Sequence, residues 1–293
     1  MSHGAAVAVR ARPPRGWRAR FAPARRAWLA LALLPAAACV DERQEVQIGA
    51  RVASQVNAQV PLVHDAPLNA YVSALGISIA RRSARPSLDY HFYIVDTDAV
   101  NAFALPGGYV YVNRGLIERT RTQSELAAVL AHEIGHVAAR HGARNLQRQM
   151  RTGSLVSVLY RVILGREPEI LNQDALNLGG ALWTAANSRA DEQEADRLAV
   201  GYLIRDGVDP RGMVTLLDRL LDEERRNPAA RNIAWFASHP TTQSRIDHAQ
   251  AEIGRDLPDP ASRHLSRDVA SYAGFLRRLD ALPPPPLTIP LGR

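Results

Sequence analysis

His132-Glu133-Ile134-Gly135-His136 places two imidazoles and one carboxylate within five residues of this 293-residue chain. Residues four apart in a helix lie about one turn apart on the same face, so both rings can reach one metal ion while Glu133 flanks the open position. We therefore expect this segment to bind Zn²⁺ and to activate water. The alternative is a helix whose histidines are satisfied by hydrogen bonds alone.

The residues around the motif predict a helix over about 123–143. Thr122 and Glu125 have the spacing of a capping box at its start. Apolar residues then recur at helical spacing, at Leu126, Leu130, Ile134 and Val137. The helix should bury this stripe against the rest of the fold.

The net charge of +7 does not indicate a nucleic-acid-binding protein, because the excess lies in a leader. Seven arginines precede residue 27, and no acidic residue precedes Asp41. Removing these seven from the 36 basic residues leaves 29, which equals the number of acidic residues. With 46% hydrophobic residues, the rest of the chain has an ordinary globular composition.

Residues 1–38 have the features of an export signal, with an arginine-rich start followed by an apolar run at 27–34 that is too short to span a membrane. Cys39 is the only cysteine and follows Ala36-Ala37-Ala38, where a bacterial lipoprotein signal would be cut. We expect lipidation of Cys39, although Ala36 replaces the usual larger aliphatic residue. The alternative is an ordinary export signal with an incidental cysteine. Val40 gives no sign of inner-membrane retention, which favours an outer-membrane anchor facing the periplasm.

The segments before the motif predict helices followed by a small sheet. Residues 42–82 have helical character and are divided by Pro61 and Pro67. Strands are expected at 88–96 and at 109–112, the second after Pro106-Gly107-Gly108. This sheet should pack against the metal-binding helix.

The segments after the motif predict further helices. Residues 152–187 are apolar and weakly patterned, and they are either a mobile lid, a membrane-touching excursion or a helical hairpin in the core. Helices are expected at 188–205, at 209–226, after a cap at Thr241, and at 262–281 before the run Pro283 to Pro286. We expect a catalytic domain at 39–255, and a C-terminal helix with a proline-rich tail, extended and disordered beyond the prolines, at 256–293.

A catalytic zinc ion normally has three protein ligands, so His132 and His136 need a partner. His141 lies about 140° around a continuous helix from His136, which excludes it. The acidic helix starting at Ser188 is the better source. Glu192 and Asp196 share a face, so one could reach the metal while the other supports a ligand histidine, but spacing alone does not choose between Glu192 and Glu194. An exposed acidic face is the alternative.

Over residues 42–253, the chain resembles the bacterial periplasmic members of metallopeptidase family forty-eight, which is related to the CAAX prenyl proteases. The motifs that carry the resemblance are Asn101-Ala102-Phe103-Ala104, Pro106-Gly107-Gly108 with the strand Tyr109 to Val112, Glu125 to His136, the acidic helix, and His239-Pro240 with Arg245. The resemblance implies a predominantly helical α+β fold of the zincin (gluzincin) type, with a small antiparallel or mixed sheet packed on the metal-binding helix.

The resemblance also implies roles for individual residues. It makes Glu192 the third zinc ligand, makes Asp196 a support of the catalytic site, and makes His239 a possible fourth ligand that holds the enzyme latent, although a histidine at a helix start can simply be a cap. The strand after Gly107 looks like the family's edge strand, to which an extended substrate could add. Gly107, Gly108, Tyr109, Val110 and Arg245 are therefore expected to bind substrate.

We expect one Zn²⁺ per subunit and endopeptidase activity on envelope proteins, in periplasmic quality control, with Glu133 as general base. The partners would be misfolded polypeptides and, through the lipid anchor, a membrane. Some relatives carry a helical-repeat domain for which there is no room after residue 281, so functions of that domain are not expected. Two alternatives are a chaperone-like factor with little or conditional proteolysis and a protein with a closed structural zinc site.

Overall fold

The computed structural model describes residues 41–151, 188–226, 239, 243–259 and 264–286. The chain divides into two units, Met1–Cys39 and Val40–Arg293, and every described residue belongs to the second. Predictions for Cys39, for 152–187 and for the cap at Thr241 fall outside the described residues.

Two helices precede the sheet, as the prolines predicted. Helix α1 (Glu42–Gln59) starts with a capping box in which the Asp41 side chain accepts from the Gln44 N–H. Helix α2 (Ala66–Ala80) is capped by Asp65 and has proline in its first turn.

The sheet has three strands, β1 (His91–Val95), β2 (Ala102–Leu105) and β3 (Tyr109–Asn113), in the order β1-β3-β2. Strand β3 is parallel to β1 and antiparallel to β2, so the sheet is mixed. Gly107 and Gly108 make the turn from β2 to β3 with φ values of 83° and 97°, a conformation that favours glycine. The predicted α+β fold with a small mixed sheet is confirmed.

The topology corrects one prediction. Strand β3 lies in the middle of the sheet, with both edges paired, so it is not an edge strand and no peptide can add to it. Strand β2, which the sequence did not predict, is an edge strand and lies against the helix that carries the motif at 132–136.

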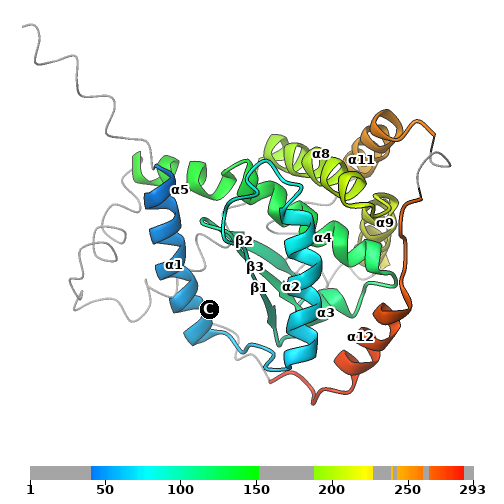
Figure 1. The fold of residues 1–293 in the computed structure, drawn as a ribbon, viewed down its shortest axis with the longest axis horizontal. Helices are drawn as coiled ribbons and strands as arrows, with labels where there is room; N and C mark the ends of the chain where they lie inside the picture. Colours follow the sequence, from blue (N-terminus) through cyan, green and yellow to red (C-terminus); the bar gives the residue numbers. More distant parts are fainter. Residues whose placement is uncertain (1–40, 152–187, 227–238, 240–242, 260–263, 287–293) are drawn as a thin grey trace, which may run out of the picture. The chain divides into compact units, whose positions relative to one another are not determined.

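Helix α4 (Gln123–Ala138) carries the motif through the centre of the fold, and all its residues from Ser124 to Val137 are buried. It lies between the sheet and the later helices (Figure 1). Its start differs from the prediction, because the Thr122 side chain makes no cap hydrogen bond. Glu125 instead accepts from the Arg121 N–H and from Arg219 on a later helix, so tertiary ion pairing replaces the capping box.

Helix α4 is also shorter than predicted. Arg140 has a φ of 58°, in the left-handed region that non-glycine residues seldom adopt, and this breaks the helix. The Arg140 side chain is held by Glu45 of α1, at 2.7 Å from Nε to Oε2. Helix α5 (His141–Arg151) then starts at the next residue.

The short helix α3 (Arg114–Ile117) follows β3, and the later helices pack around α4 and α2. They are α8 (Arg189–Asp206), α9 (Arg211–Arg226), α11 (Gln243–Asp256) and α12 (Ala270–Asp280). Helices α8, α9 and α11 lie together beside α4 (Figure 1). Helix α12 starts eight residues later than predicted, and its Phe275 ring stacks on Tyr71 of α2.

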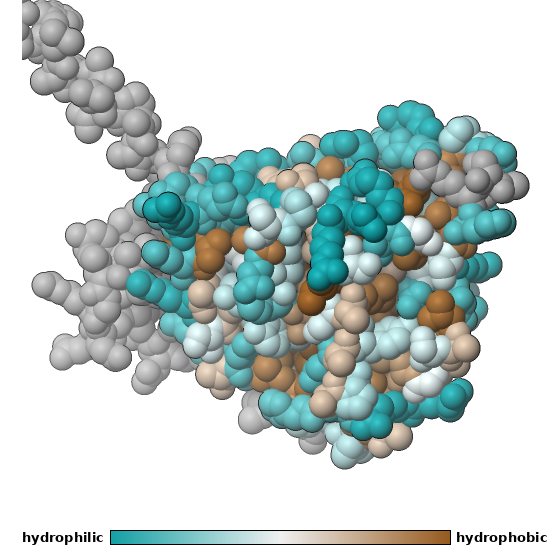
Figure 2. All heavy atoms as spheres, in the orientation of Figure 1, coloured by the Kyte–Doolittle hydropathy of each residue, from teal (hydrophilic) through white to brown (hydrophobic). Residues whose placement is uncertain are grey.

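One large hydrophobic cluster joins α2, the sheet, α4, α8, α9, α11 and α12, and a smaller one lies between α1 and the sheet. Figure 2 shows hydrophilic residues over much of one face, with smaller hydrophobic areas between them. Ile77 is the single large hydrophobic residue exposed among those described. Within the same part of the chain, no helix has the length and apolar character needed to cross a bilayer.

Candidate metal centre

Helices α4 and α8 cross closely at the motif. A Cβ atom at Gly135 would lie 2.9 Å from the carbonyl oxygen of Ala195, so the glycine lets the two backbones approach. His132, Glu133 and His136 on α4 consequently face Glu192 on α8, and all four side chains are buried.

Four side chains bring one possible ligand atom each to a common point, within 4.8 Å of one another: His132, His136, Glu192 and His239. His132 Nε2 lies 3.0 Å from His136 Nε2 and 3.4 Å from Glu192 Oε2. His136 Nε2 lies 3.3 Å from Glu192 Oε1. His239 Nδ1 lies 3.3 Å from His132 Nε2 and 3.0 Å from Glu192 Oε1.

These separations fit a tetrahedral zinc site. Ligand atoms at about 2.0–2.1 Å from one zinc ion lie about 3.3 Å from one another in a tetrahedron, and nitrogen and carboxylate oxygen are ligands that zinc prefers. Hydrogen bonds alone do not explain the set, because His132 and His136 present the same ring nitrogen to each other and to one carboxylate. The donor set therefore fits the metal that the sequence predicted.

Glu192 and Glu194, which spacing could not separate, have different surroundings. Glu192 lies in the ligand cluster, whereas Glu194 contacts His141 and Arg144 on α5. The geometry therefore supports Glu192 as the third ligand.

Asp196 and Arg245 hold His132 from behind. Asp196 Oδ1 lies 2.8 Å from His132 Nδ1, and Arg245 donates to both Asp196 oxygens at 2.6 and 2.9 Å. Arg245 Nη1 also pairs with Glu192 Oε2 at 2.9 Å. Because Arg245 is buried among these groups, it orients the carboxylates; a direct substrate contact, as the sequence suggested, would require it to leave them.

Burial and charge set the protonation of the histidines. Burial lowers the pKa of His136 to about 3, which leaves it neutral, as a ligand must be. Burial and Arg245 also oppose a charge on His132, but Asp196 and Glu192 outweigh them and raise its pKa to about 9. The carboxylates thus attract positive charge to the centre.

The pKa values of the three carboxyl groups of the site are shifted in different directions. Burial raises the pKa of Glu133, and His239 and His132 oppose this only in part. Burial would also raise the pKa values of Glu192 and Asp196, but the positive groups around them, Arg245 above all for Asp196, hold both below the ordinary range. Glu133 is therefore the one suited to take up a proton.

One oxygen of the Glu133 carboxylate differs in its surroundings from the oxygens of Glu192 and Asp196. Its Oε1 is buried and has no hydrogen-bond partner among the described residues, and it lies 3.6 Å from His239 Nε2. A buried carboxylate oxygen without a partner is unusual in a native fold. It lies beside the four possible ligands, where the predicted general base would have to be.

The sequence did not predict a role for His141. The break at Arg140 turns this residue back toward α4, where its Nδ1 lies 2.7 Å from Nδ1 of His136. Its Nε2 lies 3.1 Å from Glu194 Oε2 and 3.4 Å from Asp191 Oδ1. Burial lowers the pKa of His141, against the pull of these carboxylates.

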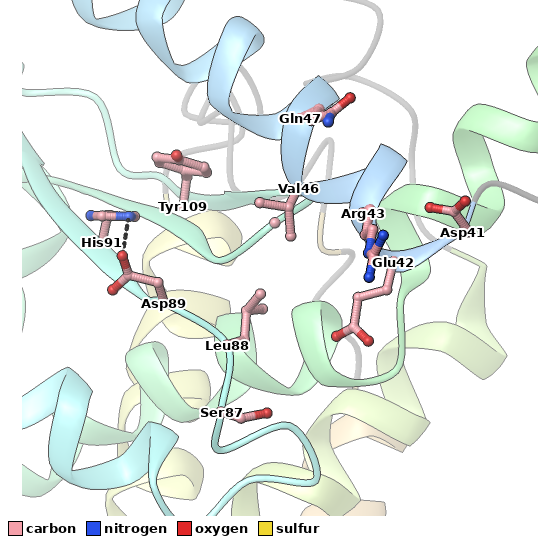
Figure 3. A pocket seen from close by; sticks show the side chains of 11 residues that line it. Asp41, Glu42, Arg43, Val46, Gln47, Ser87, Leu88, Asp89, His91 and Tyr109 are labelled. Carbon is pink, nitrogen blue, oxygen red and sulfur yellow. Dashed lines mark ion pairs between the residues drawn. The ribbon is translucent and has the colours of Figure 1, made fainter.

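The residues expected to bind substrate lie in different places. Val110 and Gly108 are buried, and a Cβ at Gly108 would lie 2.6 Å from the Asp89 carbonyl oxygen. Gly107 and Tyr109 line a cavity of about 890 Å³ between α1 and the segment before β1 (Figure 3). There the Tyr109 ring stacks on His91, which pairs with Asp89. None of the four possible metal ligands lines this cavity.

Comparison with known proteins identifies the family of this chain and several of its relatives. The model of Peptidase family M48 matches residues 66–253. The chain is 33% identical over 220 residues to the beta-barrel assembly-enhancing protease of Escherichia coli, covering 73% of this chain and 45% of that protein. The Yersinia pestis protein of the same name is 34% identical over 232 residues, covering 78% and 47%.

A third relative is metalloprotease LoiP of Escherichia coli, which is 30% identical over 189 residues, covering 64% of this chain and 70% of that protein. The chain spans about half the length of the beta-barrel assembly-enhancing proteases. The family match covers more than half of the chain and includes both helices of the metal centre. The chain therefore belongs to peptidase family M48, as the sequence motifs indicated.

Proposed function

We propose that this protein is a zinc-dependent endopeptidase that hydrolyses envelope proteins in periplasmic quality control. The observation that carries the proposal is the group His132, His136 and Glu192 beside a Glu133 oxygen that has no hydrogen-bond partner in the described part of the chain. These three residues would hold one Zn²⁺, which would polarise a peptide carbonyl and make a water molecule more acidic. Family membership and the similarity to named proteases support this reading.

Glu133 would act as general base and then as general acid. Its buried Oε1 accepts the proton of the attacking water, and its pKa, raised by burial, favours passing that proton to the leaving amine. Asp196, fixed by Arg245, keeps the His132 ring in place and its Nδ1 protonated.

The outer edge of β2 replaces β3 as the proposed place for substrate. In the ladder between β2 and β3, the Asn113 N–H donates to the Asn101 carbonyl oxygen, which fixes which residue pairs are hydrogen-bonded. Every second residue of β2 from Asn101 onward, that is Phe103 and Leu105, therefore directs its backbone groups toward β3. The backbone groups of Ala102 and Ala104 therefore point away from β3. No strand pairs with this edge in the described part of the chain, and Ala104 on it is half-buried whereas Ala102 is buried, so an extended peptide would pair with this edge at Ala104.

Two variants test the zinc assignment. Glu133→Gln should keep zinc bound and lose casein hydrolysis by at least about a hundredfold, because the general base is removed. His136→Ala should weaken zinc binding, because it removes one of the three proposed ligands and leaves only the removable His239 to take its place. Glu223→Gln, a half-exposed residue of α9 that pairs with Arg119, is the matched control. Full activity of Glu133→Gln, or undiminished zinc in His136→Ala, would contradict the site.

His239 is proposed to be a removable fourth ligand that keeps the enzyme latent. It is buried, and its Nδ1 lies within hydrogen-bond distance of both His132 and Glu192. An imidazole in the fourth position would compete with water. The same observation favours the second candidate function, a chaperone-like factor that binds misfolded outer-membrane proteins with little or conditional proteolysis.

Casein cleavage by the wild type and by His239→Ala separates the two functions. A gain of activity in the variant supports a latent protease. Absence of cleavage by both, with zinc present at one ion per subunit, supports the binding factor. A closed four-ligand site that stays inactive and binds no unfolded protein would indicate a structural zinc.

The proposed location is the periplasm, with residues 1–38 as export signal and Cys39 lipidated at the outer membrane. The support is the sequence pattern, together with the similarity to proteases named for β-barrel assembly. Wild type and Cys39→Ser, expressed in a Gram-negative host, should differ in labelling by a fatty-acid analogue and in outer-membrane fractionation. Equal fractionation without label in the wild type would refute the anchor.

A further inference from the structure

Among the described residues, no carboxylate is found at His136 Nδ1 in the position that Asp196 holds at His132 Nδ1. His136 has another histidine there. His141 Nδ1 lies 2.7 Å from His136 Nδ1, the rings are inclined at 70°, and the His141 side chain is only 1% exposed. This contact is short enough to be a hydrogen bond, so one nitrogen must donate and the other must accept.

A neutral imidazole carries one N–H and one nitrogen lone pair, which couples the two rings. If His136 offers its Nε2 lone pair to a metal ion, its proton is on Nδ1 and is donated to His141. His141 must then accept at Nδ1 and carry its own proton on Nε2. That nitrogen faces Glu194 at 3.1 Å and Asp191 at 3.4 Å, and both carboxylates are acceptors.

We propose that His141 is a positioning residue, which, held by Asp191 and Glu194, fixes His136 in the tautomer that presents Nε2 to the metal. The proposal rests on the proposed zinc site. It assigns to His141, Asp191 and Glu194 a role in metal affinity although none of them lies among the ligand atoms. The resulting order, carboxylate to His141 to His136, is a two-step version of the carboxylate–histidine–metal arrangement.

The surrounding structure holds this relay from two sides. Arg140 adopts its left-handed conformation while bonded to the buried Glu45, and this break places His141 under His136. Asp191 is fixed by the capping box of α8, in which Ser188 Oγ donates to its Oδ2 at 2.7 Å. His141 is therefore held through residues of α1 as well as α8.

Arg144 gives the carboxylates a second partner. Its Nη2 lies 3.1 Å from Asp191 Oδ1 and 3.3 Å from Glu194 Oε2. His141, Asp191 and Glu194 are near enough to one another to bind a metal themselves. However, a guanidinium already contributes the positive charge at this point, which favours a hydrogen-bonded relay over a second cation.

Two amide side chains test which nitrogen of His141 matters. In His141→Asn, the amide oxygen can stand near the position of Nδ1 and still accept from His136. In His141→Gln, the amide lies near the position of Nε2, and the acceptor at Nδ1 is lost. Zinc dissociation constants, measured by competition with a chromogenic chelator, should stay within about threefold for Asn and rise about 10–100-fold for Gln and for Ala.

The control is His248→Gln on α11, an exposed histidine outside the cluster. Thermal unfolding of the zinc-free variants identifies any that fail to fold. Equal zinc affinity of the Asn and Gln variants, whether both are weak or both unchanged, would overturn the proposal, because a merely structural histidine would not distinguish the two positions.

A second measurement does not depend on zinc. Long-range ¹⁵N correlation spectra of the metal-free full chain report which ring nitrogen of His136 carries the proton. We expect Nδ1–H in the wild type, and a mixture of tautomers in Asp191→Asn combined with Glu194→Gln. Nε2–H in the wild type, or no change in the double variant, would refute the relay. Failure of wild-type hydrolysis with the relay intact would instead refute only the proposed function.

Discussion

Gly49→Ala tests how α1 is joined to the fold. A Cβ atom at Gly49 would lie 1.9 Å from the carbonyl oxygen and 2.7 Å from the carbonyl carbon of Pro106, which precedes the turn at Gly107. Ordinary van der Waals contact begins at 3.4 Å, so α1 and the turn would have to separate by roughly 1.5 Å. Both contacting atoms belong to the backbone, and no rotamer change can relieve them.

The expected loss follows from what α1 buries. Val52 and Val56, at 5% and 6% exposure, pack in the small cluster between α1 and the sheet. Full burial of each stabilises the fold by about 1.5–3 kcal/mol, and a separation of this size forfeits a large part of both. Alanine recovers about 1 kcal/mol of helix propensity. We therefore expect Gly49→Ala to lower the free energy of unfolding by about 2–4 kcal/mol.

The assay is urea unfolding at pH 7 in the presence of a chelator, followed by circular dichroism. Gly254→Ala on α11 is the matched control, because a Cβ there meets nothing within 4 Å, and it should stabilise by about 0.5–1 kcal/mol. If Gly49→Ala behaves like Gly254→Ala, the close packing of α1 on the turn is wrong. Loss of the α1 contact should also weaken zinc binding, because Glu45 of α1 holds the break at Arg140.

Three further predictions concern charge and metal. Burial would raise the pKa of Glu125, but Arg219 and its other partners lower it below the ordinary value. The ionised Glu125 therefore stabilises the fold above its unfolded pKa near 4.5, and this stabilisation is lost as the pH falls. Glu125→Gln should lower the free energy of unfolding by about 3 kcal/mol at pH 7 and flatten the acid limb of a stability–pH curve. Arg245→Met leaves Asp196 and Glu192 buried without their cation, so it should cost about 3–5 kcal/mol with a chelator and less with zinc, by thermal unfolding in both buffers. Chelation of the wild type should lower its stability by about 2.7 kcal/mol relative to zinc at a hundred times its dissociation constant; an unchanged melting temperature would contradict specific binding to the native state.

The sequence predicted the centre of the fold well, because α4 is long and strongly periodic. Its end was missed for a nonlocal reason. The Arg140 side chain at the break is held by Glu45, 95 residues earlier in the chain, and the left-handed position is occupied by arginine and not by glycine. The exclusion of His141 as a ligand assumed a continuous helix; in the structure His141 lies outside the group of four possible ligands, and extrapolating the helix past 138 concealed its contact with His136.

The sheet was predicted less completely. Strand β2 has only four residues, two of them alanines, so it has little intrinsic strand propensity and forms because β3 pairs with it. The burial of Val110 through Asn113 without alternation is typical of a central strand. The valines and tyrosines of this strand could have indicated from the sequence that it is not an edge strand. The residues that the resemblance placed at an edge are therefore mostly interior.

Helix α8 supplies a proposed ligand, Glu192, and also the groups that orient both histidines of α4, since Asp196 contacts His132 and Asp191 acts through His141. The two helices cannot slide past each other freely, because Gly135 and Ala195 are in backbone contact where they cross. Because this crossing holds the two helices in one register, both carboxylates act on the same pair of imidazoles, and their substitutions should be non-additive in zinc affinity. A double variant of Asp191 and Asp196 whose effects simply add would show that the two histidines are oriented independently.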